Sequence, residues 1–123
     1  MDRGEILIKE IIYYCQMIEE SLKYFGKDEK DFMDDEYFQF ACAYCVLQIE
    51  EYADSFVKNS PELREEYPEI EWIGITCMRN IITDGGSKMD MGVLWKTITG
   101  EVPALKAACK KAVREQYDVN LSW

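Results

Sequence analysis

The sequence contains no histidine, and this absence removes a common route to acid–base chemistry. Histidine suits that task because its unperturbed pKa, about 6.5, lies near the working pH of most enzymes. A structural zinc site needs four ligands, and without histidine they would have to come from cysteine and carboxylate groups alone. We therefore expect neither a metal nor a cofactor in this chain.

Other scarce features favour a helical protein. Only three prolines and seven glycines interrupt the 123 residues, so long helices are expected. No apolar run approaches the roughly 20 residues of a membrane span. The N-terminus also lacks the basic start, apolar stretch and small-residue cleavage site of a secretory signal. We expect a single domain, residues 1–123, in the cytoplasm and with no membrane partner.

Positively charged residues are few compared with acidic ones. The chain has 14 lysines and arginines against 24 acidic residues, which gives a formal net charge of −10. Nucleic-acid binding is driven largely by phosphate neutralisation, so this excess works against RNA binding without excluding it. The candidate basic patch lies on one side of a C-terminal helix and consists of Lys106, Lys110, Lys111 and Arg114. A solvated helix face is the favoured interpretation.

Five cysteines in an odd, widely spaced arrangement argue against a disulfide framework. The pair Cys42-x-x-Cys45 resembles half of a zinc site, but no second pair accompanies it. Cysteine on an apolar helical stripe packs as a small hydrophobe. We therefore expect all of them to be reduced and buried: Cys15, Cys42, Cys45, Cys77 and Cys109.

Apolar residues recur in steps of three and four, which predicts four main helices. The predicted helices cover Ile8–Phe25 with a stop at Gly26, Phe38–Asn59, Glu69–Gly85 and Met91–Ala112 with a break near Gly100 and Pro103, besides a short helix after Pro61. The charged stretch 27–36 is a connector or the start of the next helix. Glu50 and Glu51 are expected on a solvated helix surface. The predicted fold class is all-α, an antiparallel bundle of four main helices plus a short one.

The stretch Glu65–Gly86 carries the most specific pattern in the chain. It runs from Tyr67-Pro68 through Trp72 to Arg79-Asn80-Ile81-Ile82-Thr83-Asp84-Gly85-Gly86. This order resembles the HepT-like family of HEPN domains, in which a Tyr-Pro-x-hydrophobic-x-Trp approach precedes a helical Arg-Asn-x-x-x-His-x-Tyr motif. The resemblance implies a HEPN-like bundle and, in active members, an RNA-cleaving site. Asp84 stands here at the histidine position and Gly86 at the tyrosine position.

These two replacements predict a site without catalytic residues. Arg79 keeps the planar donors that would steady a phosphate. Asp84, with a reference pKa of about 3.9, would be ionised, would donate a proton poorly and would repel phosphate. Whether it pairs with Arg79 is open, since residues five apart on a regular helix do not face each other. In the family, a nucleotidyltransferase antitoxin can modify the motif tyrosine, and Gly86 offers no hydroxyl for that reaction.

We interpret the chain as a catalytically inactive or impaired HepT-like protein that acts through homodimerisation and partner binding. The resemblance implies a dimer, a toxin–antitoxin relationship and a nucleotidyltransferase-type antitoxin as partner. The third predicted helix is apolar on two sides, and its second side supplies the expected dimer face: Trp72, Ile75, Met78 and Ile82. Two alternatives stay open, an active ribonuclease toxin of the same type and a nucleotide-binding module.

Overall fold

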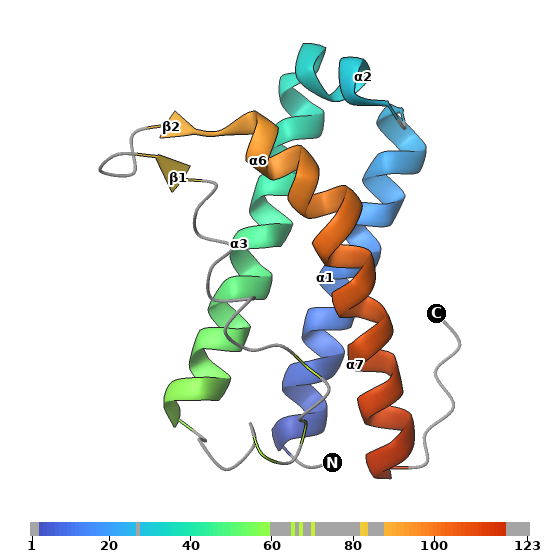
Figure 1. Ribbon diagram of the computed structural model, residues 1–123, viewed down its shortest axis with the longest axis vertical. Helices are drawn as coiled ribbons and strands as arrows, with labels where there is room; N and C mark the ends of the chain where they lie inside the picture. Colours follow the sequence, from blue (N-terminus) through green and yellow to red (C-terminus); the bar gives the residue numbers. More distant parts are fainter. Residues whose placement is uncertain are drawn as a thin grey trace.

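A computed structural model describes residues 3–26, 28–59, 65, 67, 70, 82–83 and 88–117. Figure 1 shows the arrangement of the elements along the chain. They are α1 (Arg3–Phe25), α2 (Glu29–Asp34), α3 (Glu36–Asn59), β1 (Ile82–Thr83), β2 (Lys88–Met89), α6 (Met91–Lys96), a π-helical segment (Thr97–Glu101) and α7 (Val102–Tyr117). The predicted all-α fold class is confirmed, because the two strands are only two residues each.

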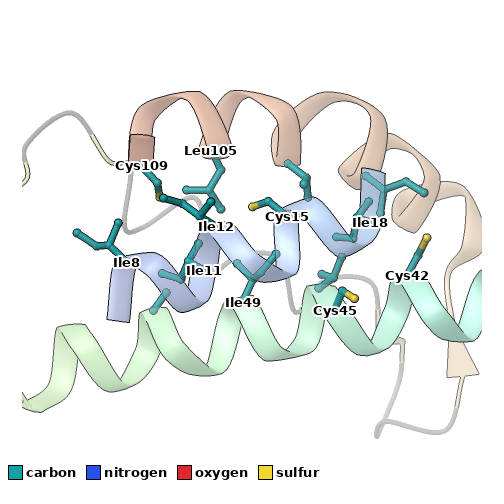
Figure 2. Packing of buried hydrophobic residues seen from close by; sticks show 14 of the residues in the cluster. Ile8, Ile11, Ile12, Cys15, Ile18, Cys42, Cys45, Ile49, Leu105 and Cys109 are labelled. Atoms are coloured by element: carbon teal, nitrogen blue, oxygen red, sulfur yellow. The ribbon is translucent and has the colours of Figure 1, made fainter. Parts of the chain in front are cut away.

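The core forms around α1, which packs against α3 on one side and α7 on the other. The buried stripe of α1 follows the predicted spacing and consists of Ile8, Ile11, Ile12, Cys15 and Ile18. Figure 2 shows these side chains between Cys45 and Ile49 of α3 and Leu105 and Cys109 of α7. Burying each large aliphatic side chain contributes about 1.5–3 kcal/mol, so this three-helix contact is the main source of stability.

The turn between α1 and α3 contains a short helix that the sequence left undecided. Gly26 ends α1 with a positive φ of 132°, a conformation that favours glycine. The carboxylate of Asp28 then accepts a hydrogen bond from the backbone N–H of Asp31 at 2.8 Å and caps α2. Asp35 caps α3 in the same way through the N–H groups of Tyr37 and Phe38. The stretch that joins α1 to α3 is therefore structured by carboxylate caps.

The break predicted near Gly100 and Pro103 is confirmed as a π-helical segment between α6 and α7. The backbone N–H of Val102 donates to the carbonyl of Thr97, a bond that spans five residues in place of the usual four. Pro103 has no N–H, so the regular α-helical ladder cannot run through this point. Ile98 within the π-helical segment and Val102 directly after it are both buried.

The predicted extent of the third helix is wrong at its C-terminal end. Ile82 and Thr83 form β1, which pairs antiparallel with β2 so that Ile82 opposes Met89 and Thr83 opposes Lys88. Two adjacent β-branched residues favour the extended conformation. The sequence that links the two strands, Asp-Gly-Gly-Ser, is rich in turn-forming residues. Ile82, predicted within this helix, is therefore part of a strand.

The turn at Gly26 gives a test of backbone conformation. A Cβ built at Gly26 would lie 2.9 Å from Cβ and Cγ of Asp31, at a φ that other residues rarely adopt. We expect Gly26→Ala to lower the free energy of unfolding by about 1–3 kcal/mol in urea titrations followed by circular dichroism. Gly100→Ala is the matched control, because a Cβ there meets no atom within 4 Å. It should be neutral or stabilising by up to about 1 kcal/mol. Equal effects of the two substitutions would contradict this account.

Candidate functional site

The residues that define the sequence motif lie outside the described part of the chain. This holds for Arg79, Asn80, Asp84 and Gly86, for Trp72, Ile75 and Met78 of the expected dimer face, and for Cys77. Ile82 is described through its backbone only, in β1. The structure does describe residues on both sides of the motif, which are Tyr67 and Ile70 before it and β1, β2 and α6 after it.

The N-terminal flank is anchored in the core. Tyr67 is completely buried and Ile70 almost so, and both belong to the main apolar cluster. The N–H of Ile70 donates to the carbonyl of Tyr67 at 3.2 Å, which ties these two residues together. The tyrosine of the Tyr-Pro approach is thus a packing residue. Its complete burial also makes it a poor substitute for the modifiable hydroxyl that Gly86 lacks.

The C-terminal flank is fixed through β2 and α6. Met89 of β2 packs against the core cluster, and Asp90 accepts a hydrogen bond from the N–H of Val93 at 3.1 Å to cap α6. Leu94 of α6 is buried, and α6 packs against α2 and α3. β1 therefore joins the end of the motif segment to a helix that belongs to the bundle. Tyr67 and Ile70 before residues 71–81 and Met89 after them therefore all belong to or pack against the core.

One lysine of the candidate basic patch on α7 forms an ion pair between helices. Nζ of Lys106 lies 2.9 and 2.8 Å from the two carboxylate oxygens of Glu19, 87 positions away on α1. The Lys106 side chain is only 15% exposed, so its charge faces the α1–α7 contact. Lys110 and Lys111 also interact with other residues. The ion pair with Glu19 agrees with a structural role for Lys106.

Glu50 was expected at the surface together with Glu51, and for Glu50 this prediction is wrong. Glu50 is buried and interacts with another residue, whereas Glu51 is exposed. Position 50 lies on the side of α3 that also carries Val46 and Ala53, both buried. That spacing was visible in the sequence and would have identified Glu50 as a buried carboxylate.

The four described cysteines are buried and reduced, as predicted: Cys15, Cys42, Cys45 and Cys109. Burial raises the pKa of Cys15 and of Cys42 to about 12 and that of Cys45 to about 11. Within the described ranges, no group of histidine, cysteine or acidic residues could hold a metal ion. Nor is any helix in this part of the chain long and apolar enough to cross a membrane. The Cys42-x-x-Cys45 pair is part of the core.

Comparison with known proteins identifies relatives of this fold. The family model described as Ribonuclease HepT-like matches residues 14–112. A protein of Methanocaldococcus jannaschii named gamma-glutamylcyclotransferase and putative RNase is 31% identical over 117 residues, which are 94% of this chain and 50% of that relative. A probable ribonuclease HepT of Thermococcus cleftensis is 32% identical over 83 residues, 67% of this chain and 72% of that relative. The chain thus spans half the length of the first relative. No solved structure matches the chain.

The buried thiols predict a slow reaction with thiol reagents. The thiolate is the reactive form, and pKa values of about 11–12 leave very little of it at pH 8. In native protein at pH 8 we expect at most one of the five thiols to react quickly, as measured by mass spectrometry. After unfolding in urea all five should be labelled. Because the pKa values are raised, labelling should accelerate as the pH increases towards 10. Fast labelling of Cys15, Cys42 and Cys45 in the folded state would contradict this core.

Proposed function

Because the chain belongs to the HepT-like ribonuclease family, we propose that its RNA-cleaving site is inactive or strongly impaired and that it acts by association. In this proposal the protein forms a homodimer and binds a partner chain, in a role related to toxin–antitoxin systems. The observation that carries the proposal is the complete absence of histidine, with Asp84 at the position of the motif histidine. The missing motif tyrosine, replaced by Gly86, supports it.

The chemistry of RNA cleavage makes this replacement costly. The reaction needs a group that takes a proton from the 2′-hydroxyl and one that gives a proton to the leaving oxygen. Such acid–base catalysis supplies roughly 10²–10⁴-fold in rate, and an ionised aspartate does not donate a proton. Its negative charge also opposes the approach of phosphate, and the net charge of −10 acts in the same direction. Arg79 alone would bind phosphate without moving protons.

The backbone after the motif arginine supports the same conclusion. In the family pattern the arginine, histidine and tyrosine follow one another on one helix. In this chain Ile82 and Thr83 belong to β1, so position 84 follows a strand. Arg79 and Asp84 are therefore not joined by the one uninterrupted helix that the family pattern requires. The two replacements and the strand together favour loss of the ancestral site.

An active ribonuclease is the second candidate function. Its support is that one relative is named a putative RNase and the other a probable ribonuclease. Arg79 and Asn80, the first two motif residues, are also retained. In this alternative another carboxylate would perform the proton transfers. A measurement of cleavage separates the two proposals directly.

Association follows from the apolar composition of the motif segment. Trp72, Ile75 and Met78 add large apolar side chains to a segment whose flanks are already packed in the core. Large apolar groups beyond the needs of one core usually mark an interface, and a symmetric pair is the commonest closed assembly. The proposed partner chain is an antitoxin of the nucleotidyltransferase type. Gly86 requires that such a partner acts by binding, because the usual hydroxyl acceptor is absent.

The RNA-cleavage prediction compares the parent with Arg79→Ala. We expect neither protein to cleave single-stranded RNA above background, first with a chelator and then with magnesium, because no motif residue can act as the acid. Asp84→His should restore little, since Gly86 still differs from the active pattern. Product formation is followed on denaturing gels. Cleavage by the parent that disappears in Arg79→Ala would establish the second candidate function.

The dimer prediction uses a matched pair of methionines. Sedimentation velocity at micromolar concentration should show a species of twice the monomer mass of 14.4 kDa. Met78→Glu should weaken the dimer at least tenfold, because it brings two unpaired carboxylates into an apolar contact. Met33→Glu, at an exposed position of α2, is the control and should leave the dimer intact. A parent that sediments only as a monomer would refute this part of the proposal.

A further inference from the structure

The outer side of α1 carries a row of large apolar residues that is separate from the core. Ile6, Tyr13, Met17 and Tyr24 are exposed to between 40% and 83%. They follow one another in steps of seven, four and seven, which places them on one side of the helix. The buried stripe of α1 lies on the opposite side. A helix with two apolar sides normally has a second contact.

The outer side of α3 carries a matching row. Tyr37, Phe40 and Tyr44 are 58–79% exposed and follow one another in steps of three and four. The buried stripe of this helix, which includes Phe38, Cys42 and Ile49, points the other way. Three bulky aromatic residues in one exposed row are unusual where packing within the chain does not require them.

Tyrosine contacts join the two rows. The ring of Tyr14 on α1 lies 5.1 Å from that of Tyr13, 6.1 Å from that of Tyr44 and 6.0 Å from that of Tyr52, measured between centroids. Partial burial and a hydrogen bond with Tyr44 raise the pKa of Tyr14 to about 12, so its hydroxyl stays neutral. The exposed rows of α1 and α3 therefore form one continuous surface, called here the aromatic face.

The charges in line with the two rows are carboxylates; of the α1 lysines beside them, Lys9 is paired with Glu5 at 2.9 Å and Lys23 is exposed next to Tyr24. Glu10 and Glu20 lie within the exposed row of α1, and Glu51 lies in line with Tyr44 on α3. The side chains of Glu20 and Glu51 are exposed. The sequence of α3 contains no lysine or arginine from Glu36 to Val57. The face thus combines aromatic anchors with carboxylates and has no cation from α3 to neutralise them.

We propose that the aromatic face is a docking surface for a partner protein that presents apolar side chains flanked by lysine or arginine. Charge complementarity selects this occupant. A second copy of the chain would bring two acidic faces together, each on a protein of net charge −10. RNA and anionic lipid surfaces would be repelled for the same reason. The proposal rests on the partner-binding part of the proposed function and locates it on α1 and α3.

The residue types of the face suit this role. Tyrosine offers a large, rigid contact area at a low cost in conformational entropy, and it is enriched among the residues that carry most of the binding energy. Carboxylates at the edge of such anchors mainly raise the association rate and make binding sensitive to salt. Binding should therefore require both the rings and the carboxylates, and this requirement distinguishes docking from general attraction to an acidic protein.

The experiment uses a synthetic helical peptide with leucine on one side and lysine on the other. A second peptide with glutamate in place of lysine is the negative probe. By fluorescence anisotropy the lysine peptide should bind the full chain at least tenfold more tightly than the glutamate peptide. The double substitution Phe40→Ser with Tyr44→Ser should weaken binding at least tenfold. Glu20→Gln with Glu51→Gln should also weaken it and should reduce its dependence on salt.

Matched substitutions elsewhere decide whether the face is specific. Met33→Ser on α2 and Glu101→Gln in the π-helical segment change exposed residues of the same kind outside the face and should leave binding within twofold. Equal weakening by these controls would show general charge attraction and would overturn the proposal. Circular dichroism of each variant verifies that it is folded.

Sedimentation of the same variants separates this proposal from the homodimer. If Phe40→Ser with Tyr44→Ser converts a dimer into a monomer, the face is covered by a second copy and the proposal of a basic partner is wrong. A dimer that persists in this variant and dissociates in Met78→Glu leaves the two surfaces distinct. Failure of the lysine peptide to bind a dimeric parent refutes only the docking surface. The RNA-cleavage result is independent of all these outcomes.

Discussion

The burial of one stripe of α1 between α3 and α7 is the contact on which the rest of the structure depends. α3 and α7 pack far more extensively on α1 than on each other. The stripe is built mainly from isoleucine, whose branched side chain has few rotamers to lose and interlocks closely with its neighbours. Shortening any of these residues would leave a cavity that both neighbouring helices border. The position of every other element is set relative to this three-helix unit.

The motif segment depends on that unit from both sides. Tyr67 and Ile70 hold its beginning in the core, and the β1–β2 pair with the Asp90 cap holds its end. Such an arrangement presents a functional segment at fixed points while leaving its own sequence free to change. The scaffold and the site are under separate physical constraints.

The sequence predicted the parts of the fold that follow from apolar periodicity. The extents of α1 and α3, the stop at Gly26 and the break before Pro103 agree with the structure, since each rests on one local rule. The end of the third helix was wrong, because two β-branched residues before a glycine-rich link favoured a strand over the helical pattern. Burial of Glu50 was missed because charge was weighed above its position on α3.

The candidate site was less predictable than the fold, for a physical reason. A motif names residue types at fixed spacing, and their chemistry depends on side-chain geometry that spacing alone does not fix. Resemblance gave the family, which the comparison confirms over residues 14–112. The exposed tyrosines of α1 and α3 were not identified from the sequence, because helical periodicity indicates an apolar stripe without showing what covers it. Only exposure in the folded chain separated the two stripes of α1.

The π-helical segment has a consequence for how the last helix is specified. The buried residues Leu94, Ile98 and Val102 are separated by two successive steps of four. On a regular α-helix each such step rotates the stripe by about 40°, so the pair would carry it well around the axis. The wider π turn offsets this rotation, so Leu94, Ile98 and Val102 all remain buried. The length of the segment Thr97–Glu101 therefore determines which side of α7 is turned towards the core. Inserting or deleting one residue there would rotate that side away from the core even if the composition of α7 stayed the same.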